Sequence, residues 1–110
     1  METTDKKLLG LLGLARRAGK LDLGADAAEQ AVRRRSAKLL LLAGDLSPRT
    51  AEKMKAQAEG AGVRCRRAET DMDALEAALG KRTGIIAVND AGFAKALLAL
   101  CAEERGGISL

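Results

Sequence analysis

Four leucines in succession, at positions 39–42, restrict the folds open to this chain more than any other stretch. They lie in the segment AKLLLLAGD, residues 37–45, which carries no polar side chain between positions 39 and 43. A second apolar run, GIIAV, occupies residues 84–88. Continuous apolar runs bounded by turn residues are typical of strands buried on both faces. The sequence therefore predicts a sheet that is covered by helices on each side.

Helical patterns alternate with these runs. Leu8, Leu11, Leu12 and Ala15 recur at helical spacing, and Ser47-Pro48 is a typical helix start, with serine as the cap and proline in the first turn. The predicted helices run from a cap at Thr3 or Thr4 to about Ala18, from Gly24 or Asp26 to about Arg35, from Ser47 to Gly60 or Gly62, over residues 72–79, and from a cap at Asn89 or Asp90 to Ala102. The predicted strands are residues 20–23, 37–45, 63–67 and 84–88.

This order predicts an α/β fold, a three-layer α/β/α sandwich with a small mixed sheet of about four strands. The length of 110 residues is that of a single domain, and we assign residues 1–110 to one. The apolar segment at residues 8–15 is too short to span a bilayer, and two arginines follow it. We therefore expect no membrane partner.

The composition excludes several kinds of chemistry. The chain has no histidine, the commonest metal ligand and general acid or base, so no cofactor, no metal and no catalysis are expected. Phe93 is the only aromatic residue, which excludes base stacking on aromatic platforms. Cys65 and Cys101 have no metal or redox spacing, and two thiols of this kind favour the reducing cytoplasm. Asp45 follows a buried strand, where catalytic carboxylates often lie, but a turn role before Ser47-Pro48 explains it better.

Positive charge is concentrated in the first two thirds of the chain. Residues 1–67 hold 15 Lys and Arg against 8 Asp and Glu, whereas residues 68–110 hold 4 against 7. Such asymmetry favours a polyanion that is contacted on one side, although a solvated surface would have the same composition.

The segment LGADAAEQAVRRR, residues 23–35, joins a glycine and small alanines to three arginines. A helix that begins near Gly24 has unsatisfied amide groups and a partial positive charge at its start, which attract phosphate groups or base edges. Asp26, Gln30, Arg33 and Arg34 lie near one face of that helix. Lys20 and Lys38 flank the segment. An alternative is that Asp26 caps the helix in a capping box with Glu29, and the arginines only offset the helix dipole.

The order of these pieces resembles the kink-turn-binding ribosomal-protein family of L7Ae and L30e, in particular its bacterial YlxQ-like branch. The resemblance rests on LLGLARRAGKLDLG, AKLLLLAGDLSPRTAEKM and IIAVNDAGFAKAL, and it covers nearly the whole chain. It implies an α/β/α sandwich and a G-x-N-E-x-x-K signature that holds the sheared G·A pairs of a kink-turn. That signature falls on residues 24–30, where Gly24 is kept, Asp26 replaces Asn, Ala27 replaces Glu and Gln30 replaces Lys.

The resemblance implies further contacts. Arg34 matches an arginine that reaches RNA, and a second RNA-contacting loop falls on residues 69–75. In this chain Glu69, Asp71 and Asp73 make that loop acidic. The RNA-binding residues we expect are Lys20, Gly24, Ala25, Asp26, Ala27, Gln30, Arg33, Arg34, Lys38, Thr70 and Asp71.

The predicted function is that of a non-catalytic, cytoplasmic RNA-binding protein that is ribosome-associated. Its partner would be a structured RNA, either ribosomal RNA or a kink-turn-like element, recognised by a degenerate signature through phosphate contacts more than base reading. Ribosomal or translation-factor proteins would be further partners. The alternative is a protein-interaction or structural domain that has kept the fold and lost tight RNA binding.

Overall fold

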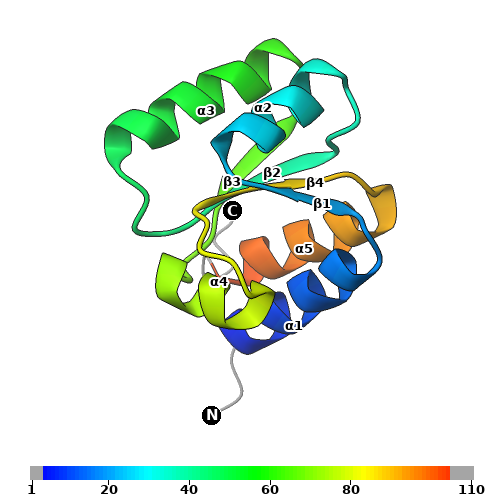
Figure 1. The fold of residues 1–110 in the computed structure, drawn as a ribbon, viewed down its shortest axis with the longest axis vertical. Helices are drawn as coiled ribbons and strands as arrows, with labels where there is room; N and C mark the ends of the chain where they lie inside the picture. Colours follow the sequence, from blue (N-terminus) through cyan, green and yellow to red (C-terminus); the bar gives the residue numbers. More distant parts are fainter. Residues whose placement is uncertain (1–3, 105–110) are drawn as a thin grey trace.

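The computed structural model describes residues 4–104, with five helices that alternate with four strands (Figure 1). The helices are α1 (Thr4–Arg17), α2 (Ala25–Arg33), α3 (Pro48–Gly60), α4 (Met72–Leu79) and α5 (Ala91–Glu104). The strands are β1 (Leu21–Leu23), β2 (Leu39–Leu42), β3 (Arg64–Arg67) and β4 (Ile85–Val88). Every helix and strand expected from the pattern is present, which confirms the predicted α/β architecture.

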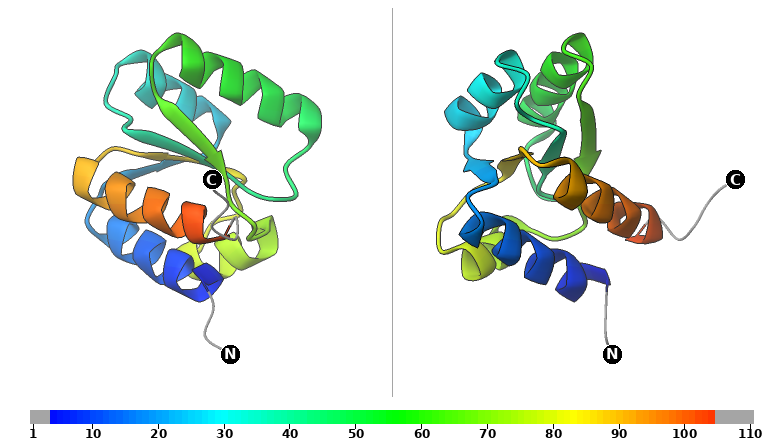
Figure 2. Two further views of the ribbon diagram at one scale, coloured as in Figure 1. Left: turned by 180° about the vertical axis from the view of Figure 1, so that it is seen from behind. Right: turned by 90° about the vertical axis from the view of Figure 1, so that its right-hand side faces the viewer.

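The four strands form one mixed sheet in the order β1-β4-β2-β3. β4 is antiparallel to both β1 and β2, whereas β2 and β3 are parallel. Helices α2 and α3 cover one face of the sheet, and α1, α4 and α5 cover the other (Figures 1 and 2). The three layers therefore bury both faces of β2 and β4, as their apolar runs require.

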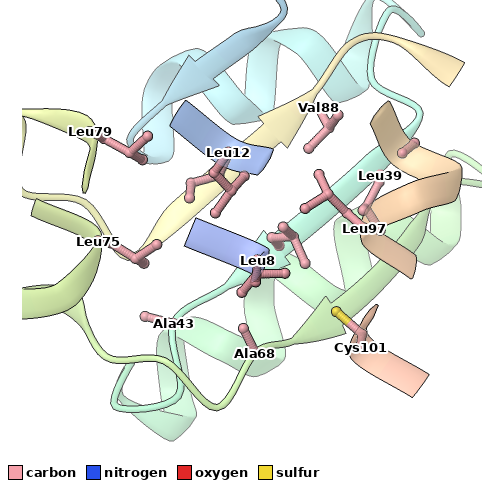
Figure 3. Packing of buried hydrophobic residues seen from close by; sticks show 13 residues of the cluster. Leu8, Leu12, Leu39, Ala43, Ala68, Leu75, Leu79, Val88, Leu97 and Cys101 are labelled. Carbon is pink, nitrogen blue, oxygen red and sulfur yellow. The ribbon is translucent and has the colours of Figure 1, made fainter. Parts of the chain in front are cut away.

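Each face of the sheet has its own core. Leu8 and Leu12 of α1 pack with Leu39, Val88 and Leu97 on one side (Figure 3). The other side is filled by small residues of α2 and by aliphatic and methionine side chains of β2 and α3: Ala28, Ala31, Val32, Leu40 and Met54. Fully burying one leucine stabilises a fold by about 1.5–3 kcal/mol. The buried alanines of α2, Ala28 and Ala31, have a structural role, because their small side chains let the helix lie close to the sheet.

Several elements are shorter than the sequence predicted. The run at 37–45 yields only four residues of strand, because its antiparallel partner β4 has four. Beyond β2, the amide of Gly44 donates to the carbonyl of Thr70 at 2.8 Å, so the chain turns away from the ladder. The second helix ends at Arg33 instead of Arg35, and Thr3, a predicted cap, lies outside the described residues.

The pairing register defines two opposite edges of the sheet. Strands β1, β2 and β3 all end at the edge where β4 begins, and we call this edge the loop end. They begin at the edge where β4 ends, next to Lys20, Lys38 and Arg64, and we call this edge the cationic end. The connections α1–β1, α2–β2 and β4–α5 lie together at the cationic end, on the right of Figure 1.

Candidate nucleic-acid interface

Helix α2 begins at the loop end with an open N-terminus. Gly24 is the N-cap residue, with φ +97° and ψ 162°, and no side chain caps the helix. The amide of Gly24 donates to the carbonyl of Ile85 at 2.9 Å, so the start of α2 is tied to β4. Glycine is required here because a positive φ strains any residue with a Cβ atom. Ala25 and Asp26 are exposed, so the first-turn amides face a surface that a ligand can reach.

Asp26 does not cap this helix. It is the second residue of α2, and its carboxylate has no hydrogen bond or ion pair within the described part of the chain. The capping-box alternative is therefore wrong, because the helix begins before Asp26. Glu29 lies instead 3.7 Å from Arg33 and 3.8 Å from Lys53. The aspartate thus stands free at the exposed start of α2.

The structure divides the predicted RNA-binding residues between the two ends of the sheet. Those at or near the loop end are Gly24, Ala25, Asp26, Ala27, Thr70 and Asp71, and those at the cationic end are Lys20, Arg33, Arg34 and Lys38, with Gln30 in between. Lys20 and Gly24 are separated by the whole of β1, which is about 13 Å at the rise of a strand. The two lysines therefore flank the end of α2 and not its start.

The arginines that follow α2 differ in how they are held. Arg33, 68% exposed, has only the 3.7 Å contact with Glu29, and Arg34 donates to Oε1 of Gln30 at 2.8 Å. Arg35 takes a left-handed backbone with φ +64°, the only such non-glycine residue in the described chain. A glycine would be the usual residue at this place after a helix. Three exposed arginines thus follow one another at the end of α2, and among them only Arg33 has an ion pair with a described residue, Glu29.

At the loop end, two aspartate side chains accept hydrogen bonds from backbone amides and so hold the loops together. Oδ1 of Asp45 accepts from the amide of Met72 at 3.0 Å, and Oδ1 of Asp71 accepts from the amide of Ala74 at 2.9 Å. Asp45 therefore joins two loops, a longer-range role than the expected turn. A hollow of about 600 Å³ beside them is lined by both aspartates, Glu69 and Arg67, among others. Three carboxylates and one guanidinium line this hollow, so its lining is acidic.

Thr70 is placed differently from the exposed site that the sequence predicted. Its side chain is 2% exposed, and its Oγ1 is buried without a hydrogen-bond partner in the described structure. Its carbonyl accepts from Gly44, whose Cα faces the carbonyl oxygen of Ala68 so closely that a Cβ would lie 2.8 Å from it. Thr70 therefore packs the loops together, and its hydroxyl is not available at the surface.

The loop before β4 is fixed to α4 by ion pairs. Arg82 lies 2.7 Å from Asp73 and 3.2 Å from Glu76. The hydrogen bonds that Arg82 donates to these two carboxylates raise the pKa of its guanidinium above the usual value. Arg82 is thus engaged in ion pairs with α4.

Asp22 and Asn89 connect β1 with β4 near the cationic end. Nδ2 of Asn89 donates to Oδ2 of Asp22 at 2.9 Å, and the backbone amide of Asn89 donates to the carbonyl of Lys20 at 2.8 Å. Asp90, not Asn89, caps α5, since its Oδ2 accepts from the amide of Phe93 at 2.8 Å. These bonds fix the backbone on which Lys20 is carried.

Two basic residues at the cationic end were missed by the sequence analysis. Arg64 begins β3, and Lys95 lies on α5. The alternation of Val63 and Cys65 with Arg64 and Arg66 indicated a solvent-exposed strand face, and Lys95 is the only charged residue in the segment 91–102. Both patterns are local in the sequence, and neither indicates which other cations lie near Arg64 or Lys95 in the fold.

The two cysteines are free thiols, Cys101 buried and Cys65 partly buried. Burial raises the pKa of the Cys65 thiol, although Lys55 and Arg66 act in the opposite direction. Among the described residues there is no group of three or more potential metal ligands. Within residues 4–104, no helix has the length and apolar character needed to cross a membrane.

The fold and the exposed start of α2 define the class of protein, an α/β/α sandwich domain with one helix that begins openly at a sheet edge. Residues 6–98 match the profile of the ribosomal protein L7Ae/L30e/S12e/Gadd45 family. The chain belongs to this family, which confirms the resemblance seen in its sequence.

The similar proteins include bacterial relatives and solved structures. The RNA-binding protein YlxQ of Enterococcus faecium is 32% identical over 86% of this chain and 90% of its own length. The YlxQ protein of Bacillus subtilis (strain 168) is 37% identical over 82% of this chain and 90% of its own. A Bacillus halodurans protein of unknown function superposes with a TM-score of 0.81, at 32% identity, over 86% of this chain and 96% of that one. The 15.5kD RNA-binding protein of Giardia lamblia, at 24% identity and a TM-score of 0.69, shares the fold over 96% of this chain and 88% of its own.

Proposed function

We propose that this protein binds structured RNA without catalysing a reaction, and that the open N-terminus of α2 docks against the RNA. The observation that carries this proposal is the glycine cap at residue 24, which leaves the amides of the first turn uncapped beside exposed Ala25 and Asp26. Such amides and the helix dipole attract phosphate oxygens and electron-rich base edges. Membership of the family and the RNA-binding relatives support the same function.

The RNA would be a kink-turn or a related structured element, recognised weakly at its bases. Asp26 accepts hydrogen bonds but donates none, and Ala27 makes neither kind through its side chain. Each lost bidentate base contact removes about 1–3 kcal/mol of discrimination. Gln30 is engaged with Arg34, and its amide nitrogen remains a donor. Most of the affinity would therefore come from phosphate contacts of cations such as Arg34 and Lys38, which position the RNA without reading its sequence.

A ribosome-linked role in the cytoplasm agrees with these features. The family is named for ribosomal proteins, and ribosomal RNA is a structured polyanion of the kind proposed here. The acidic lining of the loop end favours a second candidate, a domain that has kept the fold and contacts ribosomal or translation-factor proteins instead. Partners that survive nuclease treatment and reversal of the basic charges would support that candidate over RNA binding.

A single substitution at the start of α2 tests the proposal. Ala25→Glu places a carboxylate at the first helical position, where its interaction with the helix dipole stabilises α2 by about 0.3–1 kcal/mol. The same charge would repel docked phosphate, and we expect an approximately tenfold loss of affinity for a kink-turn RNA. Fluorescence anisotropy titrations between about 50 and 200 mM salt would measure it.

The matched control is Ala56→Glu, which makes the same charge change at an exposed position of α3. It should leave the affinity within about twofold of the unchanged protein, because salt screens charges about 10 Å or more away. Equal losses in both variants, or no binding of any RNA by the unchanged protein at the lowest salt, would contradict the proposal.

A further inference from the structure

A groove of about 570 Å³ opens at the cationic end, between the starts of β2 and β3 and the side of α5. Three cations line it, Lys38, Arg64 and Lys95, and each comes from a different segment of the chain. The rest of the lining consists of small residues and Leu98, with no acidic residue among them. The groove therefore differs from the hollow at the loop end, where carboxylates outnumber cations.

None of the three cations is neutralised within the described structure. The ion pairs found among the described side chains involve Arg33, Lys53 and Arg82, and the side chains of Lys38, Arg64 and Lys95 take part in no hydrogen bond there. Like charges that face one groove repel each other, and the repulsion is relieved only when an anion enters.

The cations continue along the edge of the sheet. Across the sheet, Val88 of β4 pairs with Leu21 on one side and with Leu39 on the other, and Leu39 pairs with Arg64. One residue further toward the cationic end, Lys20 and Lys38 therefore lie on either side of Asn89. Two strand spacings separate the backbones of Lys20 and Lys38, which is about 10 Å. Arg64, which pairs with Leu39 one residue further along the strands, lies in the groove together with Lys38. A linear polyanion fits this arrangement better than a compact anion, because the charges follow a line.

The lack of large apolar side chains in the lining of the groove argues against a protein partner. Protein interfaces depend on aromatic or large apolar anchors in pockets. Apart from the three cations, the lining consists of Gly62 and alanines of α5, with Leu98 as the one larger side chain. A surface without side-chain bulk allows a sugar–phosphate backbone to approach closely, and nearby lysine and arginine supply point charges and forked donors for phosphate.

We propose that this groove is a second RNA contact, which binds the phosphate backbone of the RNA that docks at α2. This inference rests on the proposed function and extends it to a surface at the opposite edge of the sheet. The loop end would position the RNA by its structure, and the groove would supply affinity that does not depend on sequence. Arg64 and Lys95 carry the test because neither belongs to the surface around α2.

The experiment compares Arg64→Gln/Lys95→Gln with the control Lys7→Gln/Lys55→Gln, which removes two exposed charges from α1 and α3. Both are titrated with a kink-turn RNA and a plain RNA duplex over a salt series, and thermal melting verifies that each variant is folded. The logarithm of the binding constant falls linearly with the logarithm of the salt concentration, and each lost phosphate contact makes this slope shallower by about 0.7–0.9. We expect a decrease of about 1.5 in the groove variant, an affinity loss of about tenfold or more at low salt, and an unchanged preference for the kink-turn.

An unchanged slope in the groove variant, or the same decrease in the control, would overturn the inference. If Ala25→Glu weakens binding while Arg64→Gln/Lys95→Gln does not, the proposed function stands and only the groove is wrong. If the unchanged protein binds neither RNA, both fail together. If the groove variant keeps its RNA affinity and loses an acidic protein partner, the groove is a protein site and the inference is wrong.

Discussion

Asp45 and Asp71 at the loop end bind backbone amides of the protein itself, whereas the side chains of Lys38 and Arg64 at the cationic end bind nothing in the described structure. The two edges lie on the same four strands, about 13 Å apart along β4. At the loop end the polar groups fix loop conformation, and the start of α2 is held in place there. At the cationic end the side chains of Lys38, Arg64 and Lys95 have no partner within the described structure, although others such as Arg34 and Asn89 do. Under the proposed function, the loop end would position the RNA and the cationic end would attract it.

The largest expected effect comes from reversing charge at the cationic end. Lys20→Glu combined with Arg34→Glu changes the net charge by four at one edge and should reduce RNA affinity by at least about 100-fold at low salt, because phosphate contacts become repulsive. Anisotropy titration measures the loss, and circular dichroism verifies the fold. The double reversal Lys7→Glu/Lys55→Glu has the same change of net charge, and a loss of equal size there would mean that the two ends do not differ.

A smaller effect of opposite sign is expected at the loop end. Asp45→Asn with Asp71→Asn removes two negative charges and keeps the oxygen acceptors for Met72 and Ala74. Asparagine is also a good helix cap, so the fold should be retained. Less repulsion of phosphate should raise the affinity for RNA by up to about tenfold at low salt, which is about 1.4 kcal/mol.

The control for this gain is Glu52→Gln with Glu59→Gln, which removes two exposed charges from α3. A salt titration of both variants separates a local gain from a general change in net charge. A loss of affinity in the aspartate variant would show that the carboxylates contact the RNA directly, and the assignment of the loop end as repulsive would be wrong.

The smallest effect concerns Arg35. Its left-handed backbone costs about 1–2 kcal/mol relative to an unstrained residue. Glycine avoids that strain, but part of the gain is lost because glycine raises the conformational entropy of the unfolded chain. Arg35→Gly should therefore stabilise the fold by about 0.5–1 kcal/mol. Removal of one cation from the cationic end should weaken RNA binding by about threefold to fivefold. Urea unfolding and anisotropy measure the two changes.

Arg35→Lys keeps both the charge and the strained backbone, so it should change neither quantity appreciably. If Arg35→Gly raised stability and left RNA affinity unchanged, Arg35 would not belong to the contact surface, and the cationic end would be limited to Lys20, Arg34, Lys38 and the groove.

Much of the fold could be predicted from particular residues. The leucines at 39–42 and the run at 84–88 predicted the two central strands, and Ser47-Pro48 predicted the start of α3. The site was predicted less well. Gly24 stands at the start of α2 as expected, the alternative in which Asp26 caps that helix is wrong, and Thr70, an expected RNA-binding residue, is buried. Arg64 and Lys95 were missed because nothing in the sequence near them indicates a shared groove.

The sequence by itself determined which segments are helices and strands and which of their faces are buried, because hydrophobic periodicity and capping are local properties. The tertiary structure decided which charges act together. Lys20 and Gly24 are four positions apart and lie at opposite edges of the sheet, while Lys38, Arg64 and Lys95 are distant in sequence and line one groove. Strand order and direction follow from packing between distant segments, and local patterns carry no record of that packing.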